Sequence, residues 1–335
     1  MRKYILPLAI LVFLCAALYG AHRIYDYLYA PMQTTGQKKI ITIRSGWHFD
    51  RIAQYLREQK IIQNPFRFKL MARLMGASSS IKAGEYRIDT SWSRTMLLSH
   101  LIKGDVLLHK LQIPAGLTWW DTARIVDDSG LASFSDFAEQ VHNAELLEKY
   151  GIPGSTAEGF LYPETYYFAK DKERKARRIV ERMLRQFRET TDKRLWKEQR
   201  PDGERLAQMV TLASLVEKET SVPKERPIVA GVFQNRLQRD MRLQCDPTVI
   251  YGLGRDFDGN LSKKDLRNAE NPYNTYRHKG LPPTPICSPG LDSLRAAAAP
   301  SEHDYLYFVA TKNGKHIFSR TLRQHNQAVR KHQLR

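Results

Sequence analysis

Two glutamates, Glu217 and Glu219, stand at the end of an apolar run and are the first candidates for chemistry in the chain. The run has apolar residues at helical spacing, which predicts a helix with one buried face. The spaced residues are Leu206, Met209, Val210, Ala213 and Val216. A carboxyl at the end of an apolar face is poorly solvated when ionised, so its pKa should rise toward neutral, as a general acid requires. Two solvated glutamates at an ordinary helix end are the alternative.

The helical repeat separates the two glutamates onto different faces. Residues three, four and seven positions apart stack on one side of a helix, so each glutamate has its own neighbours. Glu219 lies over Leu212, Leu215 and Val216, whereas Glu217 lies over Val210, Ala213 and Ser214. The more apolar neighbours favour Glu219 as the acid.

A set of amide, carboxylate and tyrosine side chains follows the two glutamates and could bind the hydroxyl and N-acetyl groups of a sugar. They are Asn235, Gln244, Asp246, Tyr273, Asn274 and Tyr276. These residue types are also common in ordinary turns and helix caps. Carboxylates with such partners are typical of glycan-cleaving enzymes. The chain has no Gly-x-Gly-x-x-Gly, Walker, His-Glu-x-x-His or Gly-x-Ser-x-Gly motif, so nucleotide-binding, zinc-protease and serine-hydrolase functions lack their signatures.

Composition and charge narrow the class of protein. The chain has 335 residues, 42% of them apolar, and a formal net charge of +18, which indicates an anionic partner such as nucleic acid, an acidic membrane surface or an acidic polymer. No nucleic-acid-binding motif is present. The three cysteines form no disulfide framework or zinc-site spacing. Cys245 and Cys287 could form one bridge or remain free thiols.

The N-terminus predicts a membrane anchor. Arg2 and Lys3 precede the apolar run Ile5–Gly20, which is close to the lower length limit of a membrane span. No small-residue cleavage site follows the run, and bulky residues precede Cys15, so neither a cleaved signal peptide nor a lipoprotein is favoured. We expect an uncleaved anchor at residues 1–21 with the basic N-terminus inside the cell. A buried N-terminal helix is the alternative.

The chain beyond the anchor is expected to be α+β. Residues 22–38 are expected to be a linker, followed by a small αβ module at 39–108. The segment 41–56 resembles 111–126, each a strand, a glycine turn and an amphipathic helix, which predicts a second αβ module at 109–154. The matched pairs are Ile43 and Ile113, Gly46 and Gly116, Phe49 and Trp119, Ala53 and Ala123, and Leu56 and Val126.

Residues 155–335 are expected to be a catalytic core, which with 109–154 makes one catalytic domain. A basic amphipathic helix is predicted at 171–191. Asp246-Pro247, Ser262 and Ser288-Pro289 are predicted to cap three short helices. Asn313-Gly314 between two alternating segments predicts a β-hairpin.

Four segments of this core resemble the endolytic murein transglycosylases, the MltG or YceG-like family. They are LASLVEKET, FQNRLQRDMRLQCDPTVIYGLG, NPYNTYRHKGLPPTPICSPGLDSLRAA and YLYFVA, and the resemblance covers about residues 155–330. The upstream αβ modules are similar to the LysM-like region of that family. The resemblance implies that Glu219 is the catalytic residue and that Glu217 supports the site. Cys245 and Cys287 depart from the family pattern at positions to which we assign no catalytic role.

The activity that the resemblance implies is cleavage of peptidoglycan between N-acetylmuramic acid and N-acetylglucosamine without water, giving 1,6-anhydro ends. It implies no cofactor or metal, an anchor in the inner (cytoplasmic) membrane, a periplasmic catalytic domain and penicillin-binding-protein synthases as possible partners. Two alternatives stay open. One is a muramidase that hydrolyses the bond, with Asp246 or Glu217 as the second carboxylate; the other is a non-catalytic wall-binding scaffold.

Overall fold

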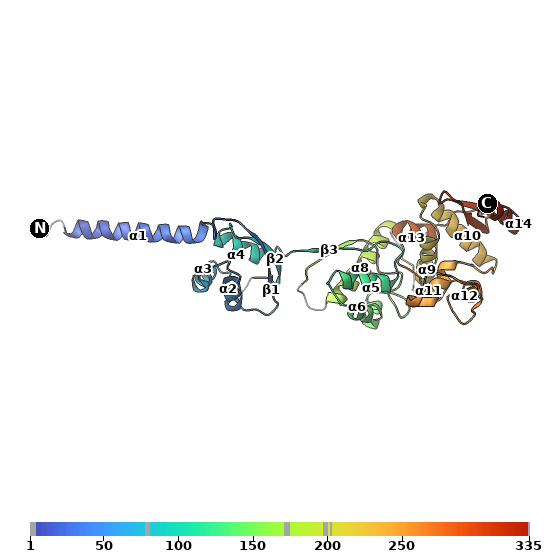
Figure 1. Ribbon diagram of the computed structural model, residues 1–335, viewed down its shortest axis with the longest axis horizontal. Helices are drawn as coiled ribbons and strands as arrows, with labels where there is room; N and C mark the ends of the chain where they lie inside the picture. Colours follow the sequence, from blue (N-terminus) through green and yellow to red (C-terminus); the bar gives the residue numbers. More distant parts are fainter. Residues whose placement is uncertain (1–4, 78–80, 171–174, 197–199, 202, 334–335) are drawn as a thin grey trace. The chain divides into compact units, whose positions relative to one another are not determined.

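The computed structural model describes residues 5–77, 81–170, 175–196, 200–201 and 203–333 (Figure 1). The described chain divides into two compact units. The N-terminal unit holds residues up to His109 together with 167–170, and the C-terminal unit holds 110–166 and the chain from 175 onward. Helices and strands are mixed in both, as the α+β expectation requires. Residues 171–174 of the predicted basic helix and residues 1–4 of the predicted anchor lie outside the described residues.

The N-terminal helix is longer than the apolar run that predicted it. Helix α1 runs Ile5–Tyr29 and has no buried residue. It continues because no proline or glycine stands between Gly20 and Pro31, and His22 pairs with Asp26 one turn on, at 3.4 Å. The expected linker 22–38 is therefore helical in its first part. Within the described chain, α1 is the one helix long and apolar enough to cross a membrane.

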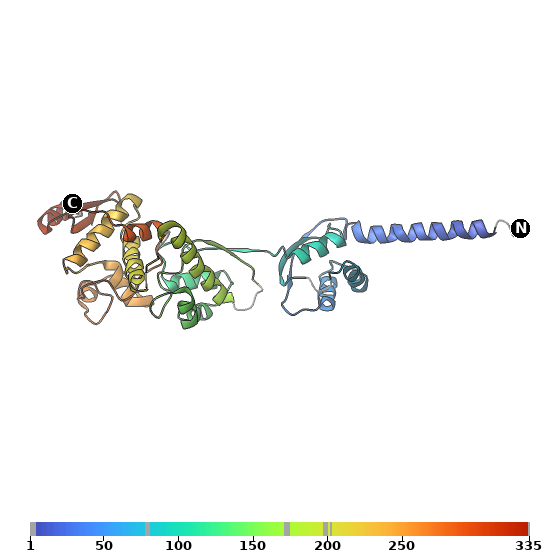
Figure 2. The same ribbon diagram turned by 180° about the vertical axis from the view of Figure 1, so that it is seen from behind.

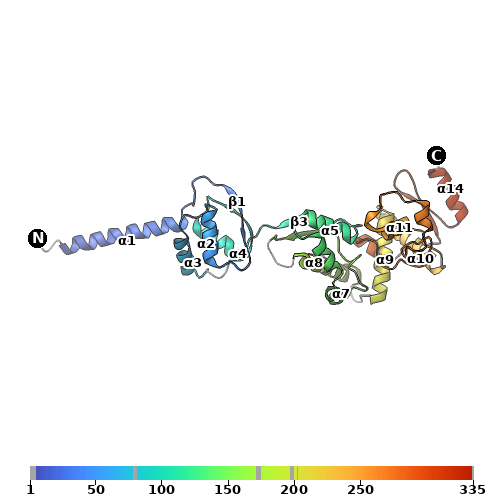
Figure 3. The ribbon, with the colours of Figure 1, turned by 60° about the horizontal axis from the view of Figure 1, so that its bottom comes forward.

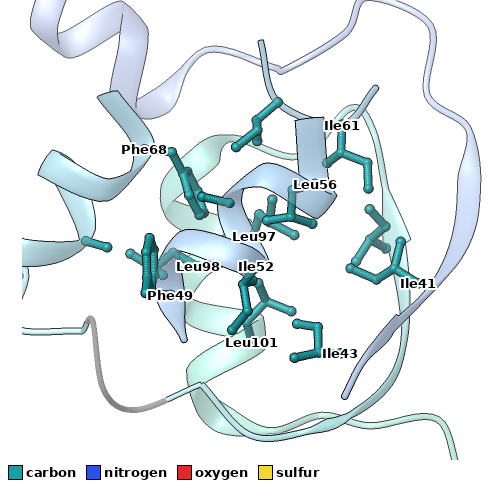
Figure 4. Close-up of a cluster of buried hydrophobic side chains, with 14 of the residues drawn as sticks. Ile41, Ile43, Phe49, Ile52, Leu56, Ile61, Phe68, Leu97, Leu98 and Leu101 are labelled. Carbon is teal, nitrogen blue, oxygen red and sulfur yellow. The ribbon is translucent and has the colours of Figure 1, made fainter. Parts of the chain in front are cut away.

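The N-terminal unit has the order strand, helix, helix, strand, helix. Its elements are β1 (Lys38–Ile43), α2 (Phe49–Glu58), α3 (Pro65–Leu74), β2 (Gly84–Asp89) and α4 (Arg94–Lys103). Strands β1 and β2 are antiparallel, with Ile41 opposite Tyr86. The two strands and three helices enclose a core of aliphatic and aromatic side chains (Figure 4). Asn64 and Ser93 cap α3 and α4 through their side chains. The unit is an αβ module as expected, and its likeness to LysM domains stays a prediction.

The same strand, turn and helix recur at the start of the C-terminal unit. Its first elements are β3 (His109–Gln112), α5 (Trp119–Asp128), α6 (Phe134–Val141), α7 (Ala144–Tyr150), β4 (Thr165–Phe168), α8 (Lys175–Thr191) and the π-helical turn Asp192–Trp196. Gly46 and Gly116 both adopt left-handed φ angles, +79° and +81°, that favour glycine. The strand that pairs with β3 is β4, so the second module extends beyond the expected boundary at residue 154.

The remaining elements follow a helix that packs against three of them, α9 (Gly203–Glu219). They are the 3-10 turn Pro223–Glu225, α10 (Arg226–Gln238), α11 (Asp246–Leu253), the 3-10 turn Gly254–Asp256, α12 (Lys263–Arg267), α13 (Leu291–Ala298), β5 (Tyr307–Ala310), β6 (His316–Ser319) and α14 (Leu322–His332). Helix α9 packs against α10, α11 and α13. Figure 2 shows α13 in red beside α9 in yellow, and Figure 3 shows α10 and α11 close to α9.

Local capping predictions have mixed outcomes in this part of the chain. Ser262 caps α12 in a capping box, and Gly314 turns the hairpin of β5 and β6 with φ +75°. The prediction that Ser288 caps the next helix is wrong, because Gly290 is the N-cap of α13. The Ser288 backbone instead bonds to Gly116 and Leu117, which ties this loop to the glycine turn before α5.

Candidate active site

Helix α9 presents Glu219 at its last turn. The predicted apolar face is buried, with Leu215 and Val216 fully enclosed beneath this turn. The helix ends because the Thr220 hydroxyl accepts the backbone N–H of Val222, and Pro223 follows. The last turn therefore fixes Glu219 between the helix core and the chain that turns away from it.

The carboxyl of Glu219 lies among groups from three other segments. The Cys245 thiol forms a hydrogen bond with it, and the charges of Asp246, His316 and Arg236 act on it. Burial is the largest influence and raises the pKa of Glu219, which the Asp246 charge reinforces. The Cys245 hydrogen bond and the positive charges lower the pKa again without cancelling the rise. The direction agrees with the prediction from the apolar helix face, and it favours a protonated carboxyl that can act as an acid.

The loop beyond α12 and the first turn of α11 hold Cys245 in place. It is the N-cap of α11, its backbone N–H donates to the Thr275 hydroxyl at 3.0 Å, and its carbonyl accepts the Thr248 hydroxyl at 2.7 Å. The prediction that Asp246 caps this helix is wrong, because Asp246 is the first helical residue and its carboxylate accepts the Tyr276 hydroxyl at 2.6 Å. No catalytic role was assigned to Cys245 from the sequence, yet its thiol touches the candidate acid.

Two basic groups near Glu219 were also missed. Arg236 on α10 is buried and donates to the backbone carbonyls of Leu306 at 2.6 Å and Leu243 at 2.9 Å. His316, the first residue of β6, contacts the Glu225 carboxylate through Nδ1 at 2.7 Å. Only the basic residue types were visible in the sequence, because the contacts that bring them to α9 span long separations.

Glu217 occupies a different environment from Glu219, as the helical repeat predicts. Its carboxylate accepts the Gly290 backbone N–H at 3.0 Å and the Arg226 guanidinium at 3.4 Å. Arg226 also contacts Asp292 at 3.7 Å. The Glu217 side chain is only 8% exposed, so these partners offset the loss of water. Glu217 thus ties α9 to the start of α13.

The predicted sugar-binding residues divide into two groups. Asn235 and Asn274 use their amide groups on backbone carbonyls: Asn235 donates to His303 and Tyr305, and Asn274 donates to three carbonyls of 265–268. Both therefore fasten loops. Gln244 is exposed beside Cys245, with a left-handed φ of +51° that is uncommon for this residue type.

Tyr276 and Asp246 form a hydrogen-bonded pair next to Glu219. The charges of Asp246 and Glu219 both act on the Tyr276 hydroxyl, which places the three groups in one site. Tyr273 instead donates to or accepts from the Thr284 hydroxyl at 2.8 Å, and its ring contacts Tyr251 with centroids 4.8 Å apart. The structure therefore groups Asp246 and Tyr276 with the candidate acid. Asn235, Asn274 and Tyr273 hold surrounding loops.

A fully buried carboxyl, Glu158, was not predicted at all. It accepts the Trp119 backbone N–H at 3.0 Å, the Gly159 N–H at 3.2 Å and the Tyr251 hydroxyl at 3.1 Å. Burial raises the pKa of Glu158 to about 8 despite these bonds. An acidic residue inside the aromatic stretch 155–169 was the signal that could have identified it. Glu158 links the second αβ module, through α5, to α11 beside the candidate acid.

Comparisons with known proteins show the family of the chain. A sequence profile of the YceG-like family matches residues 41–331. An endolytic murein transglycosylase of Bacillus subtilis (strain 168) is 29% identical over 329 residues, which cover 93% of this chain and 90% of the relative. An endolytic murein transglycosylase of Streptococcus pneumoniae serotype 2 is 28% identical over 362 residues, which cover 97% of this chain but 64% of the longer relative.

A solved structure extends the similarity to the fold. The crystal structure of a YceG-like protein from Listeria monocytogenes matches with a TM-score of 0.59 and 31% identity, covering 87% of this chain and 98% of that one. The resemblance that the four sequence segments indicated is confirmed. The chain belongs to the YceG-like family.

Proposed function

We propose that this chain is an endolytic murein transglycosylase, a lyase that cleaves the glycan strands of peptidoglycan and uses Glu219 as its catalytic residue. The names of the relatives support the reaction class. The observation that carries the assignment of the residue is the carboxyl of Glu219, which α9 holds in a site where burial raises its pKa. A single carboxyl that is protonated near neutral pH can serve first as an acid and then as a base.

The proposed reaction breaks the bond between C1 of N-acetylmuramic acid and the oxygen of the next N-acetylglucosamine. Glu219 gives its proton to the leaving oxygen as the C1–O bond breaks. The resulting carboxylate then takes the proton of the muramic C6 hydroxyl, whose oxygen bonds to C1 and closes the 1,6-anhydro ring. Glu219 ends protonated, and no water is consumed.

The other nearby carboxylates are poorly placed to act as a nucleophile or to activate water. Glu217 is held by Arg226 and the Gly290 N–H, and Asp246 accepts the Tyr276 hydroxyl. A hydrolase needs a second free carboxylate. These contacts favour the transglycosylase over the muramidase, with Glu217 in a supporting role.

The same proposal includes a membrane anchor. Helix α1 would cross the inner membrane once, with Arg2 and Lys3 on the cytoplasmic side and both folded units in the periplasm. This placement would bring the enzyme to newly made strands and to the synthases that produce them. A LysM-like role for the N-terminal unit in binding glycan belongs to this proposal as well.

The test is mass spectrometry of glycan strands treated with the purified full-length protein. We expect 1,6-anhydro-muramic ends from the wild type and none from Glu219→Gln, which keeps the shape of the side chain but cannot donate or take the proton. Glu204→Gln changes an exposed glutamate of the same helix and should leave cleavage unchanged. New reducing ends would indicate a muramidase, and no new ends from the wild type would indicate a scaffold. Cleavage by Glu219→Gln would refute the assignment of the catalytic residue.

A further inference from the structure

A buried carboxylate–imidazole pair lies beside the candidate acid and was not identified from the sequence. Glu225 lies in the 3-10 turn after α9. Its carboxylate forms hydrogen bonds with Nδ1 of His316 at 2.7 Å and with the His316 backbone N–H at 3.0 Å. The two side chains are 12% and 9% exposed. The bidentate contact fixes both the ring and the start of β6. A neutral or charged imidazole held in this way has one orientation.

The pair is joined to the last turn of α9. The Thr220 hydroxyl, next in the chain after Glu219, donates to the same Glu225 oxygen that contacts the imidazole, at 3.4 Å. The His316 ring also rests against Phe308, with centroids 5.5 Å apart and planes nearly perpendicular. These contacts leave the imidazole little freedom to turn away from the end of α9.

A negative charge lies beside the imidazole. Hydrogen bonds from His316 and its charge outweigh burial and lower the pKa of Glu225, so Glu225 is ionised at neutral pH. The other groups that face Glu219 are Asp246 and Cys245 from the start of α11, Arg236 from α10 and Tyr276 from the loop beyond α12. Among the residues whose charges act on Glu219, Arg236 and His316 lower its pKa.

We propose that His316, held by Glu225, is a positioning residue for Glu219 that stabilises the carboxylate formed when Glu219 gives its proton to the leaving oxygen. This inference rests on the proposed function. When Glu219 gives up its proton, negative charge develops on its carboxyl in an enclosed site, where a positive group held in place stabilises it more than it would in water. His316 neither gives nor takes a proton in the reaction. Its contribution is the charge, and that of Glu225 is the orientation of the ring.

The experiment compares His316→Gln, His316→Lys and Glu225→Gln in the full-length protein. Loss of the positive charge should raise the pKa of Glu219, since that charge lowers it in the wild type. The alkaline limb of kcat/KM should therefore move to higher pH in His316→Gln, with kcat reduced roughly tenfold, a part of what general acid catalysis contributes. Glu225→Gln should act in the same direction, and His316→Lys should restore part of the rate.

A second His–Glu pair in the N-terminal unit supplies the matched control. His109 Nε2 contacts Glu85 at 2.6 Å, and the two side chains are partly buried, 27% and 21% exposed. His109→Gln removes the same kind of pair and should change neither the rate nor the pH profile. Thermal melting of each variant shows whether it is folded. If His316→Gln does not fold, Glu225→Gln, which keeps the ring, provides the comparison.

An activity-independent measurement separates this inference from the proposed function. Carbon-13 NMR titration of labelled glutamate carboxyls, with the Glu219 signal assigned by its absence in Glu219→Gln, follows that group without substrate. The Glu219 midpoint should lie higher in His316→Gln than in wild type. An unchanged midpoint, or a slower variant with an unmoved pH profile, would overturn the inference even if the wild type cleaves glycan. A shifted midpoint in a protein that cleaves nothing would instead contradict the proposed function.

Discussion

Glu158 offers the sharpest test of the electrostatics in the C-terminal unit. The residue is fully buried, and its pKa is about 8 against an ordinary value of 4.5. The folded protein therefore keeps a proton on Glu158 at pH 6 to 7, where the unfolded chain has released it. Replacing Glu158 by Gln removes this titration and keeps a side chain of nearly the same shape.

The sign and size of the effect follow from proton linkage. Because the folded pKa is higher than the unfolded one, the free energy of unfolding falls as pH rises between about 4.5 and about 8 and is constant outside that window. Each pKa unit is worth about 1.36 kcal/mol, so the full fall amounts to roughly 5 kcal/mol. Below this pH window Glu158 is protonated in both the folded and the unfolded chain, so the free energy of unfolding keeps its full value.

Hydrogen exchange measured by mass spectrometry, corrected for the intrinsic pH dependence of exchange, gives the free energy of local opening. Peptides from α5 and α11 report on the segments that Glu158 joins through Trp119 and Tyr251. We expect their opening free energy to fall from pH 5 to pH 8.5 in wild type and to stay nearly level in Glu158→Gln. Glu164→Gln, an exposed carboxyl of the same segment, should behave as wild type. Equal slopes in wild type and Glu158→Gln would refute the reasoning.

Two further substitutions test packing and the thiol. Gly159→Ala should lower the free energy of unfolding by about 2 to 5 kcal/mol, because φ is +86° and the new Cβ would lie 2.5 Å from Pro285. Gly154→Ala, with a φ of +91° and open space, should lose only about 1 to 2 kcal/mol in the same urea titration. Cys245→Ala should move the alkaline limb of glycan cleavage to higher pH, because the lost hydrogen bond lowers the pKa of Glu219. Cys287→Ala, whose thiol donates to the Ser214 carbonyl, should leave that limb unmoved, and the opposite pattern would exclude the proposed role of Cys245.

Local pattern was enough to predict the elements that carry the site. The 3.6-residue repeat predicted α9 and the different faces of its two glutamates, because the neighbours involved lie within two turns of the same helix. Asn313-Gly314 predicted the hairpin for the same reason. The predicted cap by Asp246 failed because its carboxylate has a better partner, the Tyr276 hydroxyl, 30 residues along the chain.

The charge environment of Glu219 could not be predicted in this way. Glu225 and His316 are 91 residues apart, and nothing in either local sequence shows that a hairpin strand returns to the end of α9. Cys245 was set aside because a cysteine has no polar role that spacing can indicate, although as the N-cap of α11 its thiol reaches the candidate acid. A single sequence therefore reveals which residue lies in an apolar setting, whereas the groups that adjust its pKa reach it through tertiary contacts.

The opposing influences on Glu219 fit the two tasks proposed for it. An acid that must later act as a base needs a pKa high enough to hold a proton and a carboxylate stable enough to form during the reaction. Burial against the α9 core supplies the first requirement, and the Cys245 hydrogen bond with the charges of His316 and Arg236 supplies the second. If burial acted alone, Glu219 would keep its proton and be a poor acid. If the positive charges dominated, it would be ionised before substrate arrived. A raised but partly compensated pKa is the condition under which one carboxyl can perform both steps.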